Sequence, residues 1–79
     1  MHIQFSRHAK RRLKLYKIAA VVVFDILQEI DLSDGQHQII RKYVGFEYPI
    51  KIVISVRGNE ITVITAYPLK RGKKNESSL

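Results

Sequence analysis

Residues 50–67 read IKIVISVRGNEITVITAY, and this stretch decides the fold of the chain. Two runs rich in Val, Ile and Thr flank the dipeptide Gly58-Asn59, a pattern typical of two strands joined by a two-residue hairpin loop. We therefore predict strands over residues 48–57 and 60–67. With a two-residue loop, Arg57 pairs with Glu60, and this register decides which side chains share a face of the sheet.

One face of the predicted hairpin is apolar and the other is more polar. The alternation assigns the following residues to the face that receives the helices: Ile50, Ile52, Ile54 and Val56, with Ile61, Val63, Thr65 and Tyr67. The opposite face takes Lys51, Val53, Ser55 and Arg57, with Thr62, Ile64 and Ala66. A further strand is predicted upstream, over residues 36–44, before the turn region at Gly45. The strands form an antiparallel meander.

Two helices are predicted ahead of the sheet. Ser6 is a good N-cap because its hydroxyl can accept from an early helical N–H. It precedes a helical spacing of apolar residues, which are Ala9, Leu13 and Tyr16. The first helix therefore covers residues 7–16. The second covers residues 19–30, where the apolar residues with helical period are Ala19, Val22, Val23, Ile26, Leu27 and Ile30.

The run of Val over residues 21–23 favours a strand, but the length and the acidic outer face of the segment favour the second helix. Residues 31–35 then read as a loop. The predicted fold class is α+β, with two N-terminal helices packed on a three-stranded antiparallel sheet and a four-stranded sheet as the alternative. A chain of 79 residues has room for one core, so residues 1–68 form one domain. Residues 69–79 are expected to form a mobile basic and polar tail.

The chain carries a large excess of positive charge. Its 14 Lys and Arg residues against 7 Asp and Glu residues give a formal net charge of +7, and such a field attracts polyanions. Nucleic acid is the expected partner, with an acidic protein or an anionic membrane as alternatives. The sequence has no Cys, which excludes disulfides and thiolate zinc sites and fits the cytosol. Residues 1–8 have no signal-peptide pattern and the apolar run 18–24 is too short to span a bilayer, so we expect a soluble cytoplasmic protein.

Two motifs stand near the ends of the predicted domain: residues 5–12 read FSRHAKRR and residues 63–67 read VITAY. They resemble a family of small prokaryotic domains of undefined function, whose members typically read Phe-Ser-x-His-Ala-x-x-Arg and Val-Ile-Thr-x-Tyr. In broader terms, the order of helices and sheet resembles the RelE-like and BrnT-like toxins, whose fold is shared with colicin-type RNases and barnase. The chain departs from the family at Ala19, where a capping Ser is common, and at Tyr16, where many members carry Arg.

The resemblance implies a metal-independent endoribonuclease, often the toxin of a toxin–antitoxin pair, that needs no cofactor. His8 and Arg12 are four residues apart on one helical flank, so both side chains can reach one phosphate. There the imidazole acts as acid or base and the guanidinium as a planar donor fork. The alternative is that both are ordinary solvated helix residues.

Thr65 and Tyr67 are expected on the helix-facing side at the end of the last strand. A hydroxyl there can orient a phosphate, and a phenol can stack on a base. The alternative is that both are favoured strand residues that close the edge of the core.

Basic side chains of the first helix and the sheet are the predicted contacts to RNA, and they are Arg11, Arg41, Lys42, Lys51 and Arg57. Alternatively, they are only solvated charges. The tail 70–74 would add sequence-independent affinity for phosphates. His2 and His37 have no Cys or carboxylate partner at ligand spacing, so no metal site is predicted.

The leading hypothesis is thus a toxin-like endoribonuclease that cleaves RNA without metal and pairs with an acidic antitoxin. A non-catalytic RNA-binding module on the same fold is the second hypothesis. The third is a protein-interaction domain whose basic face docks an acidic partner.

Overall fold

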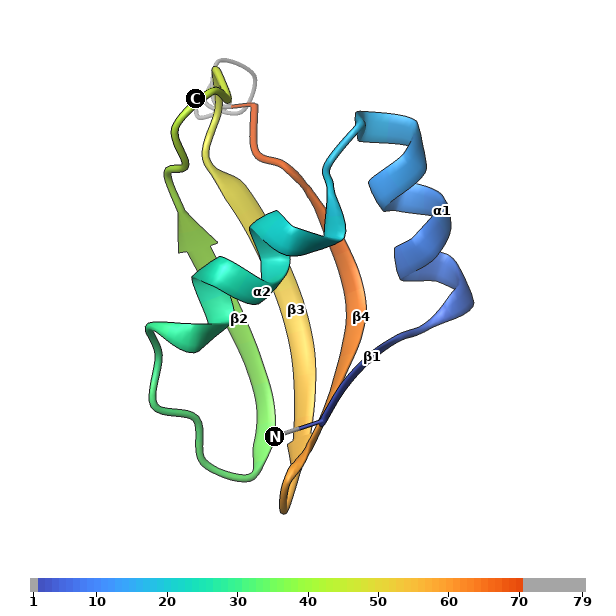
Figure 1. Ribbon diagram of the computed structural model, residues 1–79, viewed down its shortest axis with the longest axis vertical. Coiled ribbons are helices and arrows are strands. Elements are labelled where there is room, and N and C mark those ends of the chain that lie inside the picture. The colour runs from blue at the N-terminus through green and yellow to red at the C-terminus, as the bar shows by residue number, and fades with distance from the viewer. Residues whose placement is uncertain (1, 71–79) are drawn as a thin grey trace, which may run out of the picture.

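The computed structural model describes residues 2–70 and shows an α+β fold with two helices and one four-stranded mixed sheet. The elements follow in the order β1 (His2–Phe5), α1 (Arg7–Tyr16), α2 (Ala20–Gln28), β2 (Gly35–Arg41), β3 (Ile50–Arg57) and β4 (Glu60–Pro68). The strand order across the sheet is β1-β4-β3-β2 (Figure 1). The predicted mobile tail lies outside the described residues from position 71 onward.

The α+β class and both helices are confirmed, but a three-stranded, wholly antiparallel sheet is wrong. β2, β3 and β4 are antiparallel as predicted, whereas β1 pairs with β4 in parallel and places Phe5 opposite Val63. β1 has only four residues. Such a segment is too short for its alternation to be recognised in the sequence.

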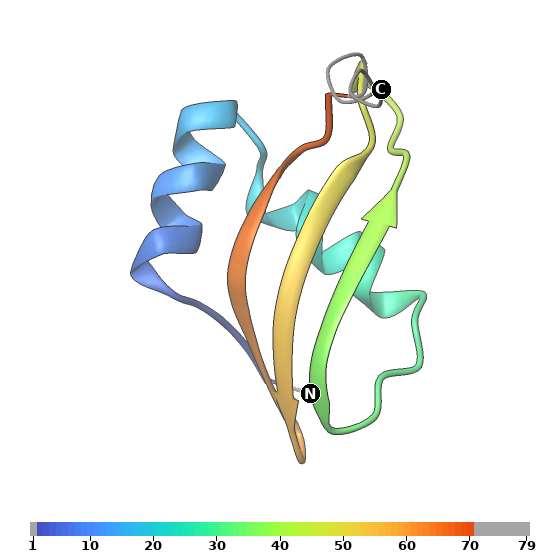
Figure 2. The same cartoon turned by 180° about the vertical axis from the view of Figure 1, so that it is seen from behind.

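The helices leave one face of the sheet uncovered. α2 crosses β2 and β3 on one face in Figure 1, and the reverse view in Figure 2 shows the opposite face without a helix. In both views α1 lies beside β4 at the margin of the sheet. We call the uncovered side the open face. By the strand register its residues include Gln4, Gln36, Gln38, Ile40, Lys51, Val53, Ser55, Arg57, Thr62, Thr65 and Tyr67.

α1 has the predicted bounds, and both of its ends are well defined. Ser6 is the N-cap, with extended backbone and a hydroxyl that accepts a hydrogen bond from the Ala9 N–H at 3.0 Å. Lys17 ends the helix with φ 55°, in the left-handed region that favours glycine. Ala9 and Leu13 are buried, so the predicted apolar stripe faces the protein.

α2 is shorter than the predicted helix over 19–30. Ala19 is its N-cap but provides no side-chain hydrogen bond, and the helix ends at Gln28. The segment still packs through the expected stripe, because Val22, Val23, Ile26 and Leu27 are buried against the sheet.

The sheet side of the core comes mainly from β3 and β4. Its buried residues are Ile39 from β2, Ile50, Ile52, Ile54 and Val56 from β3, and Ile61, Val63 and Ala66 from β4. β2 ends at Arg41 instead of Val44, and β3 begins at Ile50, because the segment between them is a loop with Gly45 at φ 92°.

A β-bulge at Ile64 changes the predicted faces of β4. Ile54 pairs with Val63 but Val53 pairs with Thr65, so Ile64 is an extra residue without a partner on β3. The alternation shifts by one residue beyond it. Ala66 is therefore fully buried in the core, and the prediction that Thr65 and Tyr67 face the helices is wrong. Both belong to the open face, opposite Val53 and Lys51.

Candidate functional site at the junction of α1 and β4

Ser6 joins the start of α1 to the bulge in β4. Its backbone N–H donates to the Val63 carbonyl at 3.0 Å, and its hydroxyl donates to the Ile64 carbonyl at 2.9 Å. The same hydroxyl caps α1 at Ala9. These contacts bring the two sequence motifs together, because the first turn of α1 is fixed beside the bulge that precedes Thr65.

The handedness of α1 places His8 and Arg12 toward the open face. α1 and β4 run side by side in the same direction in both views (Figures 1 and 2), and the buried stripe of α1 faces the protein. In a right-handed helix with this orientation, positions 8 and 12 turn to the flank beside the open face, while position 10 turns toward α2. Arg12 is accordingly half-buried, whereas Lys10 is exposed. Arg11 is exposed and points away from the sheet margin.

Counted from the Ser6–Ile64 contact, the catalytic candidates on α1 and those on β4 are similar distances along their own elements. From the Ser6–Ile64 contact, two helical residues advance about 3 Å to His8, and one strand residue advances about 3 Å to Thr65. Six helical residues advance about 9 Å to Arg12, close to the roughly 10 Å that separates Ile64 from Tyr67 along the strand.

Lys51 completes this group, since it lies directly opposite Tyr67 on the open face. We call His8, Arg12, Lys51, Thr65 and Tyr67 the α1–β4 site. One Arg12 nitrogen donates a long hydrogen bond of 3.4 Å to the Tyr16 hydroxyl. A guanidinium has five N–H donors, so most of its capacity is left for a ligand. The site therefore combines the imidazole of His8, the positive charges of Arg12 and Lys51, and two hydroxyl groups.

The hydroxyl of Thr65 has an unusual environment. Among residues 2–70, its oxygen is the buried side-chain polar atom that lacks a hydrogen-bond partner. An unsatisfied buried group of this kind costs about 1–3 kcal/mol. The oxygen is covered by neighbouring atoms, so a ligand can reach it only when a covering side chain moves. A phosphate oxygen that binds between α1 and β4 would then supply the missing partner.

The structure separates the other predicted RNA contacts. Arg57 shares the open face with Lys51, but it lies six residues away along β3, roughly 20 Å. Arg41 is opposite Ile50, which is a core residue, so Arg41 lies on the helix side of the sheet. Lys42 belongs to the loop after β2. The predicted basic groove thus reduces to two cations at opposite ends of β3.

A shallow hollow of about 360 Å³ surrounds Arg57 at the far end of the open face. It is lined by Gln4, Ser55, Arg57, Glu60 and Thr62. The Gln4 side-chain amide donates to the Thr62 hydroxyl at 3.0 Å. The sequence reasoning missed this hollow because one wall comes from β1, which was not predicted as a strand.

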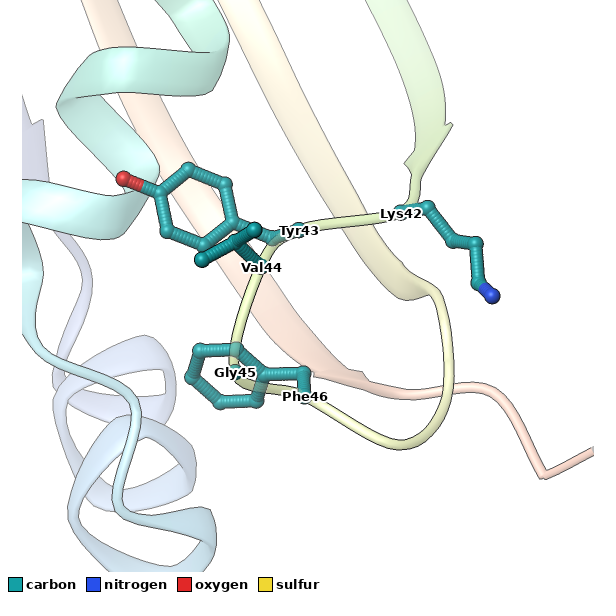
Figure 3. Close-up of a pocket in the computed structure, with 5 residues that line it drawn as sticks. All are labelled: Lys42, Tyr43, Val44, Gly45 and Phe46. Atoms are coloured by element: carbon teal, nitrogen blue, oxygen red, sulfur yellow. The ribbon is translucent and has the colours of Figure 1, made fainter.

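Another hollow, of about 370 Å³, lies in the loop between β2 and β3 (Figure 3). The Tyr43 and Phe46 rings pack edge to face, with their centroids 6.1 Å apart, and the Lys42 side chain points away from them. The Tyr43 hydroxyl donates to the Asp25 carboxylate at 2.6 Å, and this hydrogen bond raises the pKa of the Tyr43 phenol above its ordinary value. The Tyr43–Asp25 hydrogen bond ties the loop to α2.

Within residues 2–70, no group of three or more His, Cys, Asp or Glu side chains is arranged to hold a metal ion. None of the helices in that part of the chain has the length and apolar character needed to cross a membrane. Comparison of the chain with protein families, with curated proteins and with solved structures gave no match.

Proposed function

We propose that this chain is a metal-independent endoribonuclease that cleaves RNA at the α1–β4 site. The observation that carries the proposal is the hydrogen bond from Ser6 to Ile64, which fixes the first turn of α1 next to Thr65, whose buried hydroxyl lacks a partner. The net charge of +7 supports a polyanionic substrate. A RelE-like fold and a toxin role with an acidic antitoxin are part of the same proposal. They rest on the two sequence motifs and on the contact that Ser6 makes between them.

The chemistry needs no metal. The 2′-oxygen attacks the adjacent phosphorus, the bond from phosphorus to the 5′-oxygen breaks, and the products are a 2′,3′-cyclic phosphate and a 5′-hydroxyl. Two proton transfers accompany this step: one removes the proton of the 2′-hydroxyl and the other adds a proton to the 5′-oxygen. His8 carries out one of these transfers, and water or the Tyr67 phenol carries out the other. Arg12 and Lys51 stabilise the charge that builds on the phosphate. Thr65 holds a phosphate oxygen.

RNA binding without cleavage is the second candidate function. His8 is exposed, and among the described residues it makes no side-chain hydrogen bond. A general base is normally oriented by a third group, and here none is in place. The same cations would then serve only to bind phosphates.

An RNA digestion in excess EDTA distinguishes the two functions. Wild-type protein, a His8→Ala variant and a matched His2→Ala control are incubated with total RNA and tRNA, and the fragment ends are determined. His2 is also an exposed histidine, but it lies in β1 at the other end of the open face. The nuclease predicts cleavage by wild type and by the control, with cyclic phosphate ends, and none by His8→Ala. Intact RNA that is still bound by all variants would contradict cleavage and support the second candidate.

A further inference from the structure

β2 (Gly35–Arg41) is an unprotected edge of the sheet. Among the residues that the structure describes, β2 pairs only with β3, and their register runs without a bulge. Natural edge strands are usually protected by Lys, Pro, a bulge or extreme shortness. β2 has seven residues, contains neither Lys nor Pro, and carries its one charged residue, Arg41, at its last position. Its outer side is therefore a template for strand addition.

The hydrogen-bonding pattern identifies the backbone groups that are free. The Leu69 N–H donates to the Pro49 carbonyl at 2.8 Å, so odd-numbered residues of β3 bond to β4 and even-numbered ones bond to β2. The partners of the even-numbered residues are Gly35, His37, Ile39 and Arg41. It follows that Gln36, Gln38 and Ile40 direct their N–H and C=O groups to the outer edge.

We propose that a second copy of this chain adds to this edge through its own β2, antiparallel and centred on Gln38. In this register Gln36 lies opposite the partner's Ile40, and Gln38 lies opposite the partner's Gln38. All three outward residues then exchange backbone bonds, about six in total. Residues directly opposite each other share a face, so the open faces of the two copies lie on the same side of one continuous sheet.

The charges at the ends of β2 favour a second copy over an acidic peptide. Asp31 and Asp34 precede the strand, whereas Arg41 and Lys42 lie at its end. Antiparallel pairing brings the acidic end of each copy beside the basic end of the other. Asp34 also accepts a hydrogen bond from the Gly58 N–H at 3.0 Å, which holds its carboxylate at this end of the strand. An acidic peptide would instead be repelled at the start of β2.

The net charge of +7 on each copy opposes association at low ionic strength. Salt screens this repulsion and the attraction between the strand ends alike, with a Debye length of about 8 Å at physiological ionic strength, and the repulsion between two copies of charge +7 is the larger of the two. We therefore expect dimerisation to strengthen as salt is added. RNA binding is expected to weaken under the same change, so the two associations can be separated.

Amide hydrogen exchange of the wild-type protein tests the proposal directly. At concentrations where sedimentation shows a dimer, the amides of Gln36, Gln38 and Ile40 should exchange about tenfold more slowly than in dilute protein. The amides of His37 and Ile39 already bond to β3 and should change little. A protein that stays monomeric at millimolar concentration, or protection that omits these three amides, would overturn the proposal.

A Gln38→Pro variant provides an independent test, with Gln38→Ala as the control. The Gln38 N–H faces away from β3 and donates no hydrogen bond to that strand, so proline removes no β2–β3 hydrogen bond from the monomer. It removes one donor from each copy in the dimer, and the dissociation constant should rise about tenfold. Dimerisation that is unchanged in a folded Gln38→Pro protein would also overturn the proposal.

Discussion

Replacement of Ser6 by Ala should destabilise the fold far more than an ordinary surface substitution. The hydroxyl accepts from the Ala9 N–H at 3.0 Å and donates to the Ile64 carbonyl at 2.9 Å. Loss of an N-cap costs about 1 kcal/mol, and loss of a part-buried hydrogen bond costs about 1 kcal/mol more. We therefore expect the free energy of unfolding to fall by about 2 kcal/mol, which lowers Tm by roughly 10 °C in a domain of this size.

The assay is urea denaturation followed by circular dichroism, with two further variants. Ser6→Asp can cap α1 but cannot donate to the Ile64 carbonyl, so it should lose the second contribution and keep the first. Ser33→Ala changes an exposed serine and should stay within about 0.5 kcal/mol of wild type. If Ser6→Ala behaves like Ser33→Ala, the reasoning that Ser6 fixes α1 to the bulge is refuted.

Two further predictions concern α2 and the loop that it contacts. Ala19→Ser should stabilise the protein by about 1 kcal/mol, because Ala19 has extended backbone at the N-cap and makes no capping bond; thermal denaturation that shows no gain would contradict this. Asp25→Asn should lower the raised pKa of Tyr43 toward its ordinary value of 10.0, measured from the Tyr43 ring resonances by NMR. Because the folded pKa is above the unfolded one, the stabilisation from this bond is complete below pH 10 and is lost as the pH rises through the folded pKa. An identical midpoint in both proteins would show that Asp25 is not the cause.

Local signals in the sequence were sufficient for much of the fold. The spacing after Ser6 gave the bounds of α1, and the Gly58-Asn59 dipeptide gave the hairpin in which Arg57 pairs with Glu60. Gly58 has φ 61°, as the first position of a type II′ turn requires. These features depend on neighbouring residues alone, so they can be recognised without knowledge of the rest of the chain.

Features that depend on distant contacts could not be predicted in the same way. β1 is a strand only because β4 offers its edge, and the bulge at Ile64 is held by a hydroxyl 58 residues earlier in the chain. Strict alternation along β4 therefore assigned Ala66 to the face opposite the helices. In the structure, Ala66 is fully buried in the core. For a small residue within a β-branched strand, the sequence does not distinguish the two faces.

The candidate site was predicted in its residues but not in its geometry. His8 and Arg12 were chosen from helical spacing, and Thr65 and Tyr67 from the second motif. The bulge moved the latter pair to the open face, and this change is what allows them to share one side with the α1 flank and with Lys51. Arg41 and Lys42 were chosen by charge alone, which carries no information about the face on which a side chain lies.

The position of the RNA surface is the central claim, and a pair of charge reversals tests it. Lys51→Glu and Arg41→Glu each lower the formal net charge of +7 by two, but position 51 is on the open face and position 41 is on the helix side. RNA affinity is measured for both at several salt concentrations. We predict that Lys51→Glu weakens binding about tenfold more than Arg41→Glu and lowers the salt slope by about 1. Equal effects of the two substitutions would contradict an RNA site on the open face.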